Sequence, residues 1–338
     1  MNRFDYVRAT TLDEALDALA ASPGAKVIAG GTNLVDLMKH EVTRPSRIVD
    51  ITRVPLDRIE DGPDGSLRIG ALATNADTAS DPRVKDRFPL LASAILAGAS
   101  GQLRNAATTG GNLLQRTRCY YFYDVGTACN KREPGSGCPA IGGVNRIHAI
   151  QGASDHCIAT HPSDMCVAMA ALEARINVVG PGGERTIAFA DFHRLPGDAP
   201  ERDHTLADNE IITSVDLPDS DFGPHHTYLK LRDRLSYAFA LVSVAVGLKT
   251  EGERITSARI ALGGVAHKPW RLPEAEATLI GRGADDAVFG EAAERLLSGA
   301  RGQGQNNFKI GLARDAIVRA LHQAAAGTPQ SQTDKRVR

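Results

Sequence analysis

Residues 108–112 read Thr-Thr-Gly-Gly-Asn, and residues 161–164, which close the same stretch, read His-Pro-Ser-Asp. Between these segments lie four of the five cysteines of the chain, Cys119, Cys129, Cys138 and Cys157. Glycines in a turn let an anion approach backbone N–H groups, because no Cβ stands in the way. Such a turn, followed directly by a cysteine-rich loop, indicates two redox groups held by one domain.

A similar glycine turn occurs earlier, at residues 30–33, which read Gly-Gly-Thr-Asn. It follows a short apolar segment, residues 26–29, and precedes a predicted helix at residues 34–39. In the order strand, turn, helix, the free N–H groups at the helix start point at any anion bound there. The turn is not the G-x-G-x-x-G fingerprint, so by itself it is explained as well by a turn without a ligand. Two such turns predict a pair of backbone cradles that clamp one diphosphate, with coincidence as the competing explanation.

The four cysteines have the spacing C-x9-C-x8-C-x18-C, which matches neither a zinc ribbon nor a ferredoxin run. Three interpretations stay open from spacing alone. The first is a 4Fe-4S cluster, and the second is a tetrahedral zinc site with His148, His156 and His161 as further ligands. The third is unligated or disulfide-bonded cysteine. The fifth cysteine, Cys166, lies in an apolar predicted helix and is expected to be a buried small hydrophobic residue.

Composition bounds the class of protein. A chain of 338 residues with 42% hydrophobic and 23% charged residues is typical of a globular protein of two or three domains. A formal net charge of -1 gives no basic surface for nucleic acid. No apolar run is long enough for a membrane span, and the N-terminus carries no export signal of its own.

Hydrophobic periodicity and turn residues predict the local elements. Helices are expected at about residues 7–22, 34–39, 74–79, 89–104, 164–174, 273–280, 285–297 and 308–325. Ile310, Ala313, Ile317 and Leu321 are expected to form the core face of the last one. Strands are expected at about residues 26–29, 47–51, 66–71, 175–180, 184–188, 210–217, 227–231, 238–248 and 257–263.

The two glycine turns carry a family resemblance. Residues 29–34, Ala-Gly-Gly-Thr-Asn-Leu, and residues 104–113, Arg-Asn-Ala-Ala-Thr-Thr-Gly-Gly-Asn-Leu, resemble the FAD-binding medium subunit of molybdenum hydroxylases. This is the family of CO dehydrogenase flavoproteins and of the flavin domain of xanthine dehydrogenase. Residues 260–266 resemble its C-terminal domain, so that the likeness extends over residues 1–326.

The resemblance implies an α+β fold. It consists of a two-subdomain FAD-binding fold of the vanillyl-alcohol-oxidase-like type and a C-terminal domain with a three-stranded antiparallel sheet and a helix bundle. The expected divisions are subdomain 1 at residues 1–56, subdomain 2 at 57–222 with a 4Fe-4S loop insertion at about 116–160, the C-terminal domain at 223–326, and a disordered tail at 327–338.

The cysteine loop has a resemblance of its own. Residues 119–122, 129–132 and 134–138 look like the insertion in the flavin subunit of bacterial heterotrimeric aldehyde oxidoreductases, which binds a 4Fe-4S cluster besides FAD. This likeness implies that Cys119, Cys129, Cys138 and Cys157 are the cluster ligands.

The same resemblance assigns cofactor-binding positions. The residues implied to wrap the FAD diphosphate are Lys26, Val27, Ile28, Ala29, Gly30, Gly31, Thr32, Asn33 and Leu34. The opposite wall is implied to be Ala107, Thr108, Gly111 and Asn112, with Leu114 and Gln115 beside the flavin or adenosine. Ser163 and Asp164 are implied to hold the cofactor, Ile211 and Ile212 to lie near the adenine, and Lys230 to lie at the isoalloxazine. No catalytic side chain is expected, since the flavin itself carries the chemistry.

The resemblance implies that the chain is an electron-transfer subunit of a heterotrimer, which can itself dimerise. A molybdenum-cofactor subunit oxidises an aldehyde or heterocycle, a 2Fe-2S subunit relays electrons, and the FAD delivers them to an external acceptor. No counterpart of the NAD-handling loop of xanthine dehydrogenase is found, so NAD is not the expected acceptor. The expected compartment is the periplasm by co-export with a twin-arginine partner, or otherwise the cytoplasm. The alternatives are a zinc-stapled, non-redox binding module and a free-standing flavin oxidase.

Overall fold

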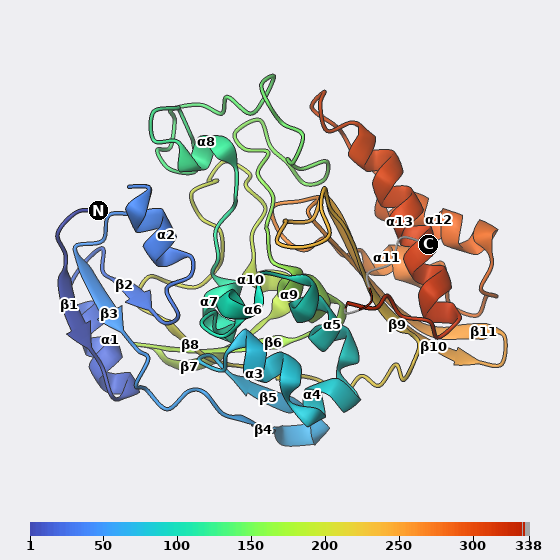
Figure 1. Ribbon diagram of the computed structural model, residues 1–338, viewed down its shortest axis with the longest axis horizontal. Helices are drawn as coiled ribbons and strands as arrows, with labels where there is room; N and C mark the ends of the chain where they lie inside the picture. The colour runs from blue at the N-terminus through green and yellow to red at the C-terminus, as the bar shows by residue number, and fades with distance from the viewer. Residues whose placement is uncertain (333, 335–338) are drawn as a thin grey trace.

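The computed structural model describes residues 1–332 and 334, which form three β-sheets with helices packed on them (Figure 1). The N-terminal sheet is parallel with the strand order β1-β3-β2. Its elements are β1 (Asp5–Arg8), α1 (Leu12–Ala20), β2 (Lys26–Ile28), α2 (Leu34–Lys39) and β3 (Arg47–Asp50). The strand–turn–helix unit predicted around residues 30–33 is therefore confirmed.

The start of the predicted helix at residues 7–22 is wrong. Tyr6 and Val7 belong to β1, where they pair with β3, and aromatic and β-branched residues favour this extended conformation. Helix α1 begins only after Thr11, whose side chain accepts the N–H of Glu14 in a capping box.

The second sheet has five antiparallel strands in the order β4-β5-β8-β6-β7. Its strands are β4 (Ile59–Asp61), β5 (Leu67–Gly70), β6 (Arg175–Gly180), β7 (Gly183–Ala188) and β8 (Ile211–Leu217), with a 3₁₀ turn, Pro63–Gly65, between β4 and β5. The helices of this region are α3 (Asn75–Ser80), α4 (Pro82–Arg87), α5 (Pro89–Ala97), α6 (Gly101–Arg104), α7 (Thr109–Leu113), α9 (Asp164–Ala171) and α10 (Phe189–Phe192). Helices α5 and α9 pack against each other, and they share one large apolar core with strands of this sheet.

Two predicted features of this region are corrected. The helix expected at residues 89–104 is two helices, because Gly98 leaves the helical conformation and Ala99 has a φ of 52°. Ser100 then caps α6 by accepting the N–H of Leu103. The second glycine turn is itself a short helix, α7, which Thr108 caps through Gly111 N–H.

The C-terminal sheet is antiparallel with the order β11-β10-β9, as expected. Its elements are β9 (His226–Leu231), β10 (Val242–Glu251) and β11 (Arg254–Gly263), followed by α11 (Pro273–Ala277), α12 (Asp286–Leu296) and α13 (Phe308–Ala325). Helix α13 lies against β9 and β10 and buries Ala313, Ile317 and Leu321, the face that the periodicity predicted.

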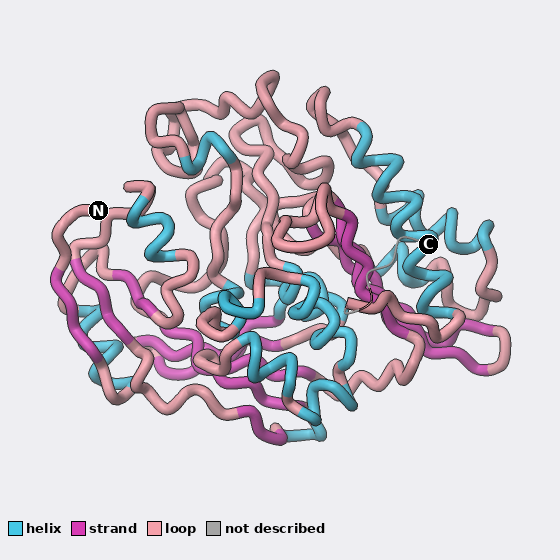
Figure 2. Tube along the Cα trace, in the orientation of Figure 1, coloured by secondary structure: helices cyan, strands magenta, loops and turns pink. Residues whose placement is uncertain are grey.

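Residues 116–160 are almost entirely loop, at the top of Figures 1 and 2. The only helix of this segment is α8 (Tyr120–Tyr123), which the sequence did not predict. Side chains hold the loop in place of backbone ladders. Arg132 donates to the carbonyl oxygens of Tyr121, Phe122 and Thr127.

The predicted disordered tail, 327–338, lies partly outside the described residues, since 333 and 335–338 are not described. In its described part, Gln330 N–H donates to Thr227 Oγ1 at 2.9 Å and Gln332 Nε2 donates to Tyr228 O at 3.0 Å. Within residues 1–332 and 334, helices of the length and apolarity that a bilayer crossing requires do not occur.

Candidate functional site

A cavity of about 940 Å³ lies between the N-terminal sheet and the second sheet. Many of the predicted dinucleotide-binding residues line it, namely Lys26, Val27, Ile28, Ala29, Gly30, Gly31, Thr32, Asn33, Leu34, Thr108, Gly111, Leu114, Ile211 and Ile212. Segments far apart in the sequence thus meet around one space. We call this space the flavin cavity, because the family resemblance implies that these residues bind FAD.

The turn between β2 and α2 has the geometry of an anion cradle. The backbone N–H groups of Gly30, Gly31 and Thr32 have no hydrogen-bond acceptor within residues 1–332. Gly31 has a φ of 70°, a conformation that side chains other than glycine rarely adopt. A Cβ on Gly30 would lie 1.7 Å from Ala106 O, so the turn presses directly against the segment that leads into α7.

The prediction that the second glycine turn offers a matching set of donors is wrong. Thr109 N–H donates to Ala73 O at 2.9 Å and Gly110 N–H donates to Ala71 O at 2.8 Å. Gly111 N–H is taken by the Thr108 cap at 3.2 Å. The two turns do face one cavity, but one supplies free donors and the other a close-packed wall.

Three further predicted residues form a hydrogen-bonded group and are not among the lining residues. Asn112 Oδ1 accepts from Gln115 Nε2 at 2.7 Å and from Ser163 Oγ at 2.5 Å, while its Nδ2 donates to Asn75 Oδ1 at 2.8 Å. This group ties α7 to the start of α9. Ala107 likewise does not line the cavity; its carbonyl accepts the N–H of Asn75.

Asp164 and Lys230 contact each other instead of the flavin cavity lining. Lys230 Nζ lies 2.7 Å from Asp164 Oδ2, and both side chains are buried. Tyr228 donates its hydroxyl to the other carboxylate oxygen at 2.7 Å. Burial and the Asp164 charge raise the pKa of Tyr228 well above its ordinary value, so it stays a donor.

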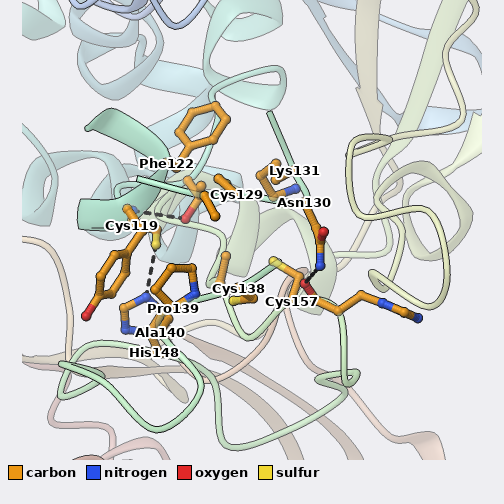
Figure 3. A pocket seen from close by; sticks show the side chains of 15 residues that line it. Cys119, Phe122, Cys129, Asn130, Lys131, Cys138, Pro139, Ala140, His148 and Cys157 are labelled. Carbon is orange, nitrogen blue, oxygen red and sulfur yellow. Dashed lines mark hydrogen bonds between the residues drawn. The ribbon is translucent and has the colours of Figure 1, made fainter. Parts of the chain in front are cut away.

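All four predicted cysteines line one small cavity of about 10 Å³, which we call the cysteine cavity (Figure 3). They are free thiols, and all but the half-buried Cys138 are buried. Although they surround one space, no three of these four described Sγ atoms lie within 4.8 Å of one another. Of the predicted spare ligands, His148 contacts a thiol, since its Nε2 lies 3.1 Å from Cys119 Sγ.

Burial sets the protonation of this cavity. It raises the pKa of Cys119 to about 12 and that of Cys157 to about 11, and it lowers the pKa of His148 to about 4. At neutral pH and without a bound cation, these groups are therefore uncharged thiols and a neutral imidazole. A bound cationic centre reverses this preference, because thiolates, not thiols, are metal ligands.

Comparisons with known proteins give the same assignment for both parts of the chain. Residues 2–220 match the FAD binding domain in molybdopterin dehydrogenase, and residues 226–324 match the CO dehydrogenase flavoprotein C-terminal domain. The chain is 50% identical to the aldehyde oxidoreductase FAD-binding subunit PaoB of Escherichia coli (strain K12) over 96% of this chain and 99% of that protein. The chain belongs to the FAD-binding medium-subunit family of molybdenum hydroxylases.

More distant members of this family agree. The glyceraldehyde dehydrogenase medium chain of Sulfolobus acidocaldarius is 28% identical over 87% of each chain. Carbon monoxide dehydrogenase from Hydrogenophaga pseudoflava contains a chain that superposes with a TM-score of 0.76 at 26% identity, covering 96% of this chain and 98% of that one. The chain is therefore an oxidoreductase subunit with the fold of the CO dehydrogenase medium subunit.

The flavin cavity fits the cofactor of this family. Its volume falls within the roughly 300–1,000 Å³ that is usual for cofactor sites. The unpaired N–H groups of the first glycine turn can receive a diphosphate. Four cations, Lys26, Arg116, Arg194 and Arg202, share the lining with the carboxylates of Glu201, Asp203, Asp208 and Glu210.

Cys166, His161 and His193 form a third cluster, with ligand atoms within 4.8 Å of one another. Cys166 is buried, as the sequence predicted. His193 Nε2 lies 2.9 Å from Leu113 O and donates to it, whereas His161 Nδ1 accepts Ser163 N–H at 3.4 Å. With Nδ1 accepting, the hydrogen of His161 lies on Nε2, so in this tautomer Nε2 does not present the lone pair that a metal needs.

Sequence reasoning missed the charged residues that irregular segments bring to these sites, among them Arg116, Asp203 and Lys131. Arg116 and Asp203 line the flavin cavity, and Lys131 lines the cysteine cavity with only 2% of its surface exposed. A lysine two positions after Cys129 was a detectable signal. Nothing in the irregular segment around Asp203 marks that residue in the sequence.

Proposed function

We propose that this chain carries both FAD and a 4Fe-4S cluster and transfers electrons within a molybdenum-dependent hydroxylase that acts on aldehydes. One observation carries the proposal. Four free cysteines line the same small cavity, and no three of their Sγ atoms lie within 4.8 Å of one another, in a chain whose family binds FAD.

The spacing favours a cluster over zinc. Zinc–sulfur bonds of about 2.3 Å in a tetrahedron bring the thiolates to about 3.8 Å from each other. The four sulfurs are not already arranged as such a tetrahedron, since no three of them fall within 4.8 Å of one another. A 4Fe-4S cluster binds each thiolate through a different iron and therefore needs a larger cage.

In the flavin cavity, the N–H groups of Gly30 to Thr32 would bind the diphosphate, and Lys26 and Arg116 would balance its charge. We retain Asp164 and Lys230 as residues beside the flavin ring. Neither residue lines the flavin cavity, so this role rests on the family resemblance; the ion pair between them, at 2.7 Å, makes the lysine a fixed charge rather than a mobile one. Bound FAD supplies the ability to take up electrons singly and to release them singly or in pairs.

The remaining catalytic steps belong to partner subunits. We propose a 2Fe-2S subunit and a molybdenum-cofactor subunit, assembled as a heterotrimer that delivers electrons to an external acceptor. The relatives named as aldehyde oxidoreductase and glyceraldehyde dehydrogenase subunits support an aldehyde substrate. We also propose a division at residues 1–56, 57–222 and 223–326, since each range contains one of the three sheets.

Turnover with and without partners tests this function. The assembled complex should reduce an external acceptor when an aldehyde is added, and the isolated chain should show activity only with an artificial electron donor. Aldehyde oxidation by the isolated chain would instead identify a free-standing flavin oxidase. A colourless, zinc-loaded chain would identify a non-redox module.

A further inference from the structure

A chain of ion pairs connects the cysteine cavity to the flavin cavity. Lys131 lies between Cys129 and Cys138 in the sequence and lines the cysteine cavity. Its ammonium group donates to Asp203 Oδ1 and, at 2.6 Å, to Pro200 O. Asp203 lines the flavin cavity, and its other oxygen accepts Arg116 Nε at 2.7 Å.

Arg116 extends this connection into the glycine turn. Its backbone N–H donates to Asn33 Oδ1 at 2.9 Å, and Asn33 leads into α2. Its guanidinium lies 4.7 Å from the ring centroid of Phe122, which lines the cysteine cavity. One residue therefore contacts the anion cradle on one side and the wall of the cysteine cavity on the other.

The charges of these linked ion pairs are held in fixed positions. Only 1% of the Lys131 side chain and 18% of the Asp203 side chain are exposed, so solvent screens their attraction weakly. Burial alone would raise the pKa of Asp203, but the charges of Lys131 and Arg116 hold it far below its ordinary value. The nearby His267, 3.9 Å from Asp203, adds no charge, because burial lowers its pKa to about 4.

We propose that Asp203 is a positioning residue that couples FAD binding to the occupancy of the cysteine cavity. When the four cysteines hold their centre, the loop around Lys131 is fixed, and Lys131 then holds Asp203 and Arg116 at the flavin cavity. Without that centre, the loop relaxes and the lining of the flavin cavity loses its anchor. By linkage, FAD must stabilise the filled cysteine cavity by the same factor.

This inference rests on the proposed function, because it requires both cofactors. The test is a cycle of FAD dissociation constants, measured by fluorescence quenching on the full-length chain with iron present and after anaerobic chelation. In the unsubstituted chain, iron removal should weaken FAD binding about tenfold, within the usual range of couplings between sites. In Asp203→Asn, the affinity should be the same with and without iron.

Asp198→Asn is the matched control. Asp198 lies in the same irregular segment, its side chain is fully exposed, and it lies 3.6 Å from the exposed imidazole of His156. This variant should retain the tenfold difference. Lys131→Met should lose the difference, whereas Lys131→Arg, which keeps the charge, should restore part of it. If Asp203→Asn does not fold, this second pair of variants still tests the coupling.

A merely structural role for Asp203 predicts a different pattern, in which Asp203→Asn weakens FAD binding equally in both iron states and the tenfold difference survives. That result, or an unsubstituted chain whose FAD affinity ignores iron, would overturn the inference while leaving the proposed function intact. A chain that binds no iron or no FAD would refute the proposed function itself.

Discussion

The flavin cavity is shaped where β2 runs through a glycine turn into α2, so regular elements fix its backbone donors. The cysteine cavity lies within residues 116–160, where α8 is the only helix of the segment and side chains such as Arg132 hold the backbone. The first site exists before its ligand arrives. The second has little regular structure to preserve it, so we expect the proposed cluster to supply much of its stability.

Because of this difference, the two sites are sensitive to different kinds of substitution. Backbone donors are removed only by moving the backbone, whereas sulfur ligands are removed one side chain at a time. The two sites should therefore fail independently under single substitutions, apart from the coupling through Asp203.

The largest effect is expected for Cys138→Ser. The variant should lose its iron, because a serine hydroxyl replaces one of four ligands, and it should unfold at a lower temperature. It should still retain most of its FAD when FAD is supplied in excess, since the glycine turn lies outside the loop. Metal analysis and flavin absorbance measure both. The control is Cys166→Ala, which keeps its iron because Cys166 does not line the cavity. Equal loss of both cofactors in Cys138→Ser would show that the loop is integral to the flavin cavity.

The substitution Gly30→Ala is the corresponding test of the flavin cavity. Its Cβ would fall 1.7 Å from Ala106 O, so the turn must move away from the segment before α7. We expect at least a tenfold loss of FAD affinity with iron content near that of the unsubstituted chain. Gly101→Ala serves as the control, because nothing lies within 4 Å of its Cβ. Undiminished FAD binding by Gly30→Ala would contradict the cradle geometry.

A smaller effect is expected for Arg132→Gln, which leaves up to three carbonyl oxygens of the cysteine loop without their donor. The expected destabilisation is about 2 kcal/mol, the usual cost of losing hydrogen bonds to a charged group. It should appear as faster iron loss to a chelator. Arg146→Gln is the control in the same loop, since its ion pair with Asp233 is exposed and contributes little. Identical rates in the two variants would argue against a loop held by side chains.

The smallest effect concerns the regular region alone. Burial would raise the pKa of Asp50 on β3, but hydrogen bonds from Tyr6, Thr52 and Arg8 lower it from 3.8 to about 2. A lowered pKa stabilises the fold above about pH 4, and this stabilisation is lost as the pH falls through 2. Asp50→Asn should therefore cost about 2 kcal/mol at pH 7 and much less near pH 2.5. Denaturant unfolding at the two pH values measures it, and a cost independent of pH would contradict the assignment.

The features that sequence predicted well are the locally determined ones. The turn at residues 30–33, the α13 face and the three C-terminal strands follow from glycine chemistry and apolar periodicity. Helix α7 was missed because two glycines disfavour a helix. A Cβ at position 110 would lie 3.2 Å from the Cβ of Ala71, and this close packing favours glycine there. The strand β1 was missed because its partner, β3, lies about forty residues along the chain.

The predicted site residues show the same contrast between features that are set locally and features that depend on distant contacts. The residues of the first glycine turn were predicted and line the cavity, but the donors expected from the second turn are used internally. The four cysteines could be gathered only through a family resemblance, because their spacing left zinc open. Lys131 and Asp203 meet through irregular segments, and no local pattern encodes such a contact.

The central claim is that one chain holds a flavin and a four-iron cluster in separate cavities. Anaerobic purification of the full-length chain, followed by a visible spectrum and metal analysis, tests it most directly. The account predicts flavin bands, a broad shoulder that dithionite bleaches, and about four irons per FAD. Zinc in place of iron, or iron without flavin bands, would contradict it.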